Sequence, residues 1–446
     1  MNEKQMAAHP LVAAYVEEVC NHVKAKDVHK NIADELQGHL LERIEDLKEL
    51  EQLSDEEAIA AAVKGMGDAR EVGIGLNAAH KPKTEWSVVA TFAVMLLLAV
   101  VALFVMPNEL RFSVAYKLVI ALVGLILMVA AYFCNYQKLA RWSWALYGIT
   151  IVFMVYVLLF GTEINGMREW LSLGRYGFNI SEVSPYLLIV AIAGVLYNDQ
   201  KTEHTSREMS LMIVCKQLVA FILLPMLVYV STPTMSSLVI YSLGLFVLLL
   251  VFGRWRFTLA AAGTLIAGMV LLLSYNTSKF SYIYLRLTGM FSNDPNVNYQ
   301  ALRSMEAISA GGLWGQGVGV ANPRLPFAHS EMMYTYLVYS LGWIFGSVIV
   351  LVALTFVWRT TQMGLKTKDM YGRALIIGIC SIFGLRLLWN LLMCLGIVPI
   401  VGITPPFLHI SSASILEFGL MGFMLGIYRR KDMISQRQSF HSALSK

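Results

Sequence analysis

The sequence predicts an all-α, polytopic membrane protein, in which about ten transmembrane helices follow a small N-terminal helical soluble domain. Of its 446 residues, 57% are hydrophobic and only 15% are charged, whereas soluble globular chains average about 25% charged residues. Residues 1–85 carry a net charge of −7, and the remaining residues carry +12. This composition, with its polar acidic head and charge-poor basic body, argues against a water-soluble enzyme, a disordered chain or a disulfide scaffold.

The head comprises residues 1–80 and is followed by a linker at 81–86. It is too polar to supply the apolar core of a secretory signal. We expect it to fold as short helices that pack through one apolar stripe, because hydrophobic residues recur there at helical spacing. The stripe consists of Ile32, Leu36, Leu40 and Ile44.

Capping residues mark the helix boundaries in the head. Ser54 and Glu57 form a capping-box pattern, and Asp68 with Glu71 repeats it. Gly67 favours the end of the intervening helix, because glycine tolerates a left-handed cap. The head resembles the helical prefix domain found before some bacterial permease-like proteins, which implies a cytoplasmic interaction or sensing module with a cytoplasmic partner. The resemblance rests on Ile32-Ala33-Asp34-Glu35-Leu36, His39-Leu40, Glu56-Glu57-Ala58-Ile59 and Met66-Gly67-Asp68.

The body contains ten windows of mostly apolar sequence, and a membrane span needs about 20 such residues. An even number of spans places both termini on the same side of the membrane. The windows cover residues 87–106, 113–134, 142–160, 183–197, 211–230, 235–252, 256–274, 331–357, 373–396 and 406–428.

Positive charge predicts the orientation of these spans. Basic residues concentrate in the loops and the tail (429–446) on the N-terminal side, which predicts that both termini are cytoplasmic in a bacterial cell membrane. The positive charge is explained by orientation, and we expect no nucleic-acid partner. The inner loops carry Lys138, Arg141, Lys201, Arg207, Arg254, Arg256, Arg359, Lys366, Lys368 and Arg373.

The longest outer loop is predicted at 275–330 and contains a glycine-rich run at 311–319. Loops of this length are usually functional or disordered. The glycine run is interpreted either as a tight turn packed at the membrane surface or as backbone N–H groups that approach a phosphate.

Ionisable residues inside spans are costly and therefore suggest function. The alternative for Lys117, Arg386 and Glu417 is ion pairing between helices. Three further polar residues lie at outer span ends, and they are Glu182, Glu331 and His409.

Four outer segments together resemble the SEDS family (shape, elongation, division and sporulation), whose members include FtsW, RodA and SpoVE. Ten spans and a long loop after the seventh also fit that family, and the resemblance covers residues 87–428. The segments are Asn165-Gly166-Met167-Arg168-Glu169-Trp170 with Ser181-Glu182; Tyr299-Gln300 with Gly311-Gly312 and Gly315-Gln316-Gly317-Val318-Gly319; Leu325-Pro326 with His329-Ser330-Glu331; and Asn390, Gly396-Ile397-Val398-Pro399, Gly402-Ile403-Thr404 and Pro406-Phe407.

The resemblance implies a peptidoglycan glycosyltransferase that polymerises lipid II at the outer membrane face, together with a class B penicillin-binding protein. Glu331 aligns with the catalytic Asp of the family, so its carboxylate is the candidate general base. We expect no cofactor, with a divalent cation as the alternative, and no metal ligands are assigned. Candidate substrate-binding residues are Arg168, Glu182, Arg286, Gln300, Arg303, Arg324, His329 and Arg386.

Several polar positions depart from the family pattern. Glu331 replaces Asp and lengthens the side chain by one methylene, and Pro185 replaces the lysine expected to pair with Glu182. Further departures are Thr234, Tyr339 with Ser340, and His409 with Ser411-Ser412. Two alternatives therefore stay open beside the enzyme. One is a non-catalytic scaffold or regulator that acts through the head, and the other is a transporter of lipid-linked precursors.

Overall fold

The computed structural model describes residues 9–24, 26, 29–79, 83–107, 114–164, 167–173, 176–203, 211–232, 234–275 and 298–431. Chain contacts divide the protein into two compact units. The first contains residues 1–84 together with 428–446, and the second contains residues 85–427. Each unit is described by itself below.

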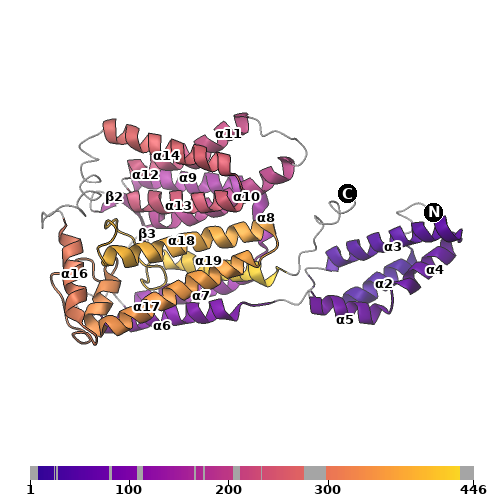
Figure 1. Ribbon diagram of the computed structural model, residues 1–446, viewed down its shortest axis with the longest axis horizontal. Helices are drawn as coiled ribbons and strands as arrows, with labels where there is room; N and C mark the ends of the chain where they lie inside the picture. The colour runs from indigo at the N-terminus through magenta and orange to yellow at the C-terminus, as the bar shows by residue number, and fades with distance from the viewer. Residues whose placement is uncertain are drawn as a thin grey trace. The chain divides into compact units, whose positions relative to one another are not determined.

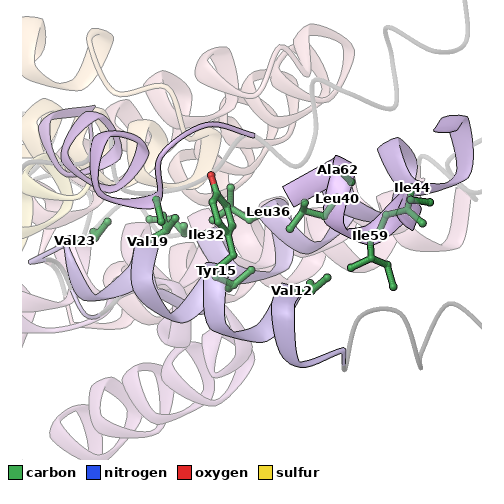
Figure 2. Packing of buried hydrophobic residues seen from close by; sticks show 13 residues of the cluster. Val12, Tyr15, Val19, Val23, Ile32, Leu36, Leu40, Ile44, Ile59 and Ala62 are labelled. Carbon is green, nitrogen blue, oxygen red and sulfur yellow. The ribbon is translucent and has the colours of Figure 1, made fainter. Parts of the chain in front are cut away.

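The described part of the head contains four α-helices around a hydrophobic core of its own. Its helices are α2 (Pro10–Asn21), α3 (His29–Glu51), α4 (Asp55–Gly65) and α5 (Ala69–Ala79). The predicted stripe of Ile32, Leu36, Leu40 and Ile44 is buried, and it packs with side chains of α2 and α4 (Figure 2). One of these helices, α3, is longer than the short helices expected from the sequence, since it has 23 residues.

Both capping predictions in the head are confirmed. The Glu57 carboxylate accepts hydrogen bonds from the N–H (3.2 Å) and the Oγ (2.7 Å) of Ser54 at the start of α4. The Asp68 carboxylate accepts from the N–H groups of Arg70 (2.8 Å) and Glu71 (3.2 Å), and so caps α5. The left-handed backbone between these helices falls at Gly67, where φ is +88°.

Ten helices of the described residues occupy the ten predicted spans, which confirms the all-α polytopic fold (Figure 1). Seven are long and apolar enough to cross a membrane, and two more are shorter apolar helices. The ten are α6 (Trp86–Val105), α7 (Val114–Phe133), α9 (Ser143–Phe160), α10 (Ile180–Glu203), the continuous α11–η3–α12 (Leu211–Leu218, Val219–Leu223, Leu224–Ser231), α13 (Met235–Val251), α14 (Trp255–Tyr275), α17 (Met333–Leu365), α18 (Met370–Cys394) and α19 (Ser414–Arg429).

Two of these helices form the centre of the bundle. α10 packs against α9, α13 and α18, and α18 also packs against α13 and α17. Within the apolar window of α10, 78% of residues are buried, against 17% for α7. Helix α7 therefore presents most of its surface to lipid, whereas α10 and α18 are enclosed by other helices.

One end of the bundle carries the elements that the sequence patterns did not resolve. A three-stranded antiparallel sheet joins α9 to α10, with strands β1 (Thr162–Ile164), β2 (Met167–Leu173) and β3 (Tyr176–Asn179). Helix α16 (Tyr299–Gly311) lies across the same end (Figure 1). We call this end, at which α10 and α17 begin and α18 ends, the sheet end.

The predicted start of the last span is wrong. Helix α19 begins at Ser414 rather than at residue 406, and the segment 395–413 has no regular secondary structure. Proline lacks the N–H that a helix needs, and the adjacent Pro405 and Pro406 fall in this segment. The segment 395–413 therefore lies among the helices at the sheet end as irregular backbone with turns, and it brings polar backbone groups into the bundle.

Helix α17 is broken at Gly342, where φ is +84°. At the break, backbone N–H and carbonyl groups of α17 are free of helical hydrogen bonds and instead bond to the glycine-rich run. Gln316 N–H donates to the Tyr339 carbonyl (2.9 Å), and Trp343 N–H donates to the Gly312 carbonyl (2.8 Å). This pairing supports the interpretation of the run as a packed turn. It does not favour a phosphate cradle, because these N–H groups already have acceptors.

A substitution at Gly342 tests this pairing. An added Cβ would overlap the Leu313 carbonyl, and the positive φ alone costs about 1–3 kcal/mol in a non-glycine residue. We expect Gly342→Ala to lower the melting temperature of the purified protein in detergent. Gly263→Ala is the control, because nothing lies within 4 Å of its Cβ position in α14. Equal melting temperatures of the two variants would contradict the prediction.

Candidate functional site

Glu331 lies at the sheet end, two residues before α17 begins. Its backbone carbonyl accepts a hydrogen bond from Asn390 Nδ2 of α18 at 2.8 Å. The same Nδ2 donates to the Ile403 carbonyl at 2.7 Å. Since Asn390 is fully buried, one amide group fixes the start of α17 against the segment 395–413.

A glycine allows that segment to approach the Glu331 carboxylate. At Gly402, φ is +75°, and an added Cβ would lie 3.2 Å from Glu331 Oε1. That spacing is tighter than ordinary van der Waals contact, so a side chain at this position would push against the carboxylate. Glu331 is half-buried, and its carboxylate lies against the backbone of Gly402.

A buried cluster of charges lies deeper in the bundle, around Arg386 of α18. Its guanidinium forms ion pairs with Glu182 of α10 and, at 2.6 Å, with Glu417 of α19. It also donates to Tyr186 Oη (3.1 Å) and to Thr404 Oγ1 (2.8 Å). Arg386 and Glu417 are 4% and 2% exposed. The arrangement explains how Glu182 is paired although Pro185 replaces the lysine that the family resemblance led us to expect.

The ion pairing bears on the interpretation of these residues. Arg386 and Glu417 form an ion pair between α18 and α19. This confirms the alternative interpretation of these two residues given from the sequence. Arg386 and Glu182 are brought together, but with each other as partners, and their role as substrate-binding residues stays a prediction. Because one guanidinium serves two carboxylates, the Arg386–Glu182–Glu417 cluster carries a net negative charge when all three groups are ionised.

Glu169 is a site residue that the sequence patterns missed. It lies on β2, half-buried, and its carboxylate is hydrogen-bonded to Asn179. Burial, together with the nearby charges of Glu182 and Glu331, raises the pKa of Glu169 to about 7, although the hydrogen bond to Asn179 opposes this shift. Three carboxylates thus meet at the sheet end. Side chains alternate along a strand, so recognising β2 would have separated Glu169 from exposed Arg168.

Four other predicted residues lie on β2, on α16 and in the loop before α17. Arg168 pairs with Glu163 at 3.0 Å, with about half of each side chain exposed. Arg303 on α16 pairs with Glu306 at 2.6 Å and lies over the Tyr299 ring. Gln300 is on α16, and Arg324 is exposed in the loop before α17. The ion pairs of Arg168 and Arg303 are thus made with Glu163 and Glu306 rather than with Glu331, and Arg286 lies outside the described residues.

His329 lies two residues before Glu331 and is half-buried. Burial lowers the pKa of His329, and the positive charge of Lys117 lowers it further. Lys117 is on α7, so the start of that helix also approaches the site. Among the described residues, no group of three or more His, Cys, Asp or Glu side chains is arranged to hold a metal ion, and the divalent cation stays a prediction.

The fold and this acidic site define a multi-pass helical membrane protein whose polar centre lies at one end of its bundle. The family model described as cell cycle protein (FtsW, RodA, SpoVE) matches residues 83–432. That range is more than half of the chain, so the chain belongs to this family, as the four sequence segments predicted. The head lies almost entirely outside the matched range.

Curated relatives agree with this assignment. The chain is 27% identical over 321 residues to the probable peptidoglycan glycosyltransferase FtsW of Trichlorobacter lovleyi, covering 70% of this chain and 82% of the relative. It is 26% identical over 329 residues to stage V sporulation protein E of Bacillus subtilis, covering 70% of this chain and 86% of the relative.

Two solved structures share the fold of the body. A chain from a peptidoglycan synthase complex that coordinates polymerization and crosslinking superposes with a TM-score of 0.64 and 20% identity, covering 78% of this chain and 98% of that chain. The rod shape determining protein RodA of Thermus thermophilus gives a TM-score of 0.56 and 21% identity, covering 78% of this chain and 97% of RodA. At these identities the comparison shows the fold alone.

Removal of the Arg386 charge tests the buried cluster. Arg386→Met leaves Glu182 and Glu417 buried without their cation, and breaking a buried ion pair costs about 3–5 kcal/mol. We expect a large fall in the melting temperature measured in detergent. Arg168→Met is the control, because exposed ion pairs contribute about 0–1 kcal/mol. A similar melting temperature in both variants would show that the buried ion pairs do not stabilise the bundle.

The pH dependence of stability tests Glu169. Because folding raises the pKa of Glu169 from about 4.5 to about 7, the folded protein keeps a proton that the unfolded chain has released. Stability is therefore lost as pH rises through this window. We expect Glu169→Gln to raise the melting temperature more at about pH 8 than at about pH 5. Exposed Glu163→Gln should show no such difference, and a pH-independent effect of Glu169→Gln would contradict the assignment.

Proposed function

We propose that this chain polymerises glycan strands from lipid II at the outer face of the bacterial cytoplasmic membrane, with both termini in the cytoplasm. The name of the FtsW relative, a peptidoglycan glycosyltransferase, supports the reaction class. The likeness to a chain of a peptidoglycan synthase complex supports a class B penicillin-binding protein as partner. In this orientation the sheet end faces outward, as the distribution of basic residues predicts.

The observation that carries the proposal is the placement of the Glu331 carboxylate. It stands at the sheet end against Gly402, on a backbone that Asn390 ties to the middle of the family-matched bundle. A general base must be held within hydrogen-bond reach of the proton it removes. The attachment of its backbone through Asn390 supports such placement, and the absence of a side chain at Gly402 lets the segment 395–413 lie against the carboxylate without a clash.

The chemistry then follows from the groups present. A sugar hydroxyl of one lipid-linked unit attacks the anomeric carbon of another, and the C–O bond to the polyprenyl pyrophosphate breaks with its electrons. Glu331 takes the hydroxyl proton. General-base assistance of this kind contributes about 10²–10⁴-fold. Glu169 lies close enough to Glu331 for the two to interact electrostatically, and its negative charge, when Glu169 is ionised, favours proton uptake by Glu331.

The test is a lipid II polymerisation assay on purified full-length protein with a class B penicillin-binding protein present. We expect Glu331→Gln to lower the polymerisation rate by at least about 100-fold, because the amide cannot accept the proton. Glu331→Asp keeps the carboxylate and should retain measurable activity. Glu56→Gln, an exposed residue of the head, is the matched control and should polymerise at the wild-type rate.

The outcomes separate the enzyme from the alternatives. Normal polymerisation by Glu331→Gln would remove Glu331 as the base while leaving the reaction class intact. A wild-type protein that never polymerises, with any partner, would favour the scaffold or regulator. If the protein is a regulator that acts through the head, deletion of residues 1–80, which lie outside the matched family range, should reproduce the effect of losing the whole protein.

A further inference from the structure

Helix α7 contains a buried cation that the proposed mechanism does not use. Only three residues of α7 are buried, namely Lys117, Ile120 and Gly124, and their spacing places them on one helix face. This face is directed into the bundle, while the rest of α7 is exposed where lipid would surround it. Lys117 is 5% exposed. A lysine has thus been placed on the one face of α7 that other helices cover.

Lys117 has no carboxylate partner among the described residues. Three other cations at the sheet end are ion-paired, since Arg386 binds two glutamates, Arg303 binds Glu306 and Arg168 binds Glu163, whereas Arg324 is exposed in the loop before α17. No hydrogen bond or ion pair of the described residues includes the Lys117 ammonium. Burying an ammonium group without a partner is strongly unfavourable. The unpaired position of Lys117 therefore calls for an anion from outside the described chain.

Packing brings a second polar group to the same place. Ile120 of α7 and Ile410 of the segment 395–413 belong to one hydrophobic cluster, against which Tyr116 also packs. His409 precedes Ile410, and its Nδ1 atom is buried without a hydrogen-bond partner. The close approach of α19 to α7, where Gly422 meets the Met128 backbone, holds these two parts of the chain together.

The charged groups near Lys117 are compatible with a bound anion. Lys117, His329, Glu182 and Arg386 all lie close enough to His409 to interact with it electrostatically. Two of these neighbours, Glu182 and Arg386, already bind each other, and Glu182 also accepts a hydrogen bond from Thr404. The nitrogen-bearing side chains of Lys117, His409 and His329 thus gather beside the Glu331 segment.

We propose that Lys117, with His409 and His329 beside it, binds the diphosphate of the polyprenyl-linked substrate. This inference rests on the proposed function and names the group that receives the leaving pyrophosphate. Lysine binds phosphate groups as a point charge, and a cation there stabilises charge that develops as the C–O bond breaks. The exposed apolar face of α7 lets the polyprenyl tail remain in contact with lipid while its diphosphate enters the bundle.

The test measures lipid binding rather than turnover. Full-length protein in detergent is titrated with undecaprenyl pyrophosphate, undecaprenol and phosphatidylglycerol, and bound lipid is quantified by native mass spectrometry. We expect Lys117→Met to weaken binding of the pyrophosphate at least about tenfold and to leave undecaprenol binding unchanged. Lys117→Arg should retain pyrophosphate binding. Lys216→Met, an exposed lysine on α11, is the matched control and should bind like the wild type.

A second measurement on the wild-type protein avoids any folding defect of a variant. Lys117 is 5% exposed, so a small amine-reactive reagent should modify it slowly in the free protein, through the opening that would admit the diphosphate; no modification at all would contradict the proposal. Undecaprenyl pyrophosphate should protect it, whereas undecaprenol should not. The proposal is overturned if Lys117→Met binds the pyrophosphate normally, if undecaprenol protects equally, or if phosphatidylglycerol binds through Lys117 as tightly, since the site would then recognise any anionic lipid.

These results are distinguishable from failure of the proposed function. A wild-type protein that binds the pyrophosphate through Lys117 but never forms glycan would overturn the glycosyltransferase and leave a pyrophosphate-lipid site. A polymerising wild type whose pyrophosphate binding does not depend on Lys117 would overturn only the assignment of this lysine.

Discussion

The arrangement at the sheet end depends on the Arg386 guanidinium. From one position on α18 it binds Glu182 of α10, Glu417 of α19 and Thr404 of the irregular segment. Charged groups buried in this way cannot exchange their partners for water, so the three elements are fixed relative to α18. One turn further along α18, Asn390 extends the same attachment to the start of α17, and the position of the candidate base follows from it.

This constraint also decides how charge is distributed. Because Arg386 is occupied by two carboxylates, it contributes little attraction for an anionic substrate, although its depth in a membrane helix marks it as functional by the usual criterion. The carboxylates of Glu169, Glu182 and Glu331 instead make this region acidic. A phosphate-bearing ligand would then need a cation that is not already paired, and Lys117 of α7 is a buried cation of this kind in the described structure.

The predictable parts of the fold are those governed by local sequence. Ten spans were found because each has enough apolar residues in one run, and the caps at Ser54 and Asp68 were found because capping acts over three or four residues. The small sheet was missed because its strands are short and lie between spans. The start of α19 was misplaced because apolar composition does not reveal that Pro405 and Pro406 interrupt the helix.

The sequence by itself determined that this chain crosses a membrane many times, that it carries a capped helical head, and that Glu331 is a candidate for catalysis. These properties depend on hydrophobicity, spacing and motif order, which are local. Only the tertiary structure decided which charges neutralise one another. Pairing depends on side chains about 200 residues apart, such as Glu182 and Arg386, meeting in a medium where an unpaired charge is costly.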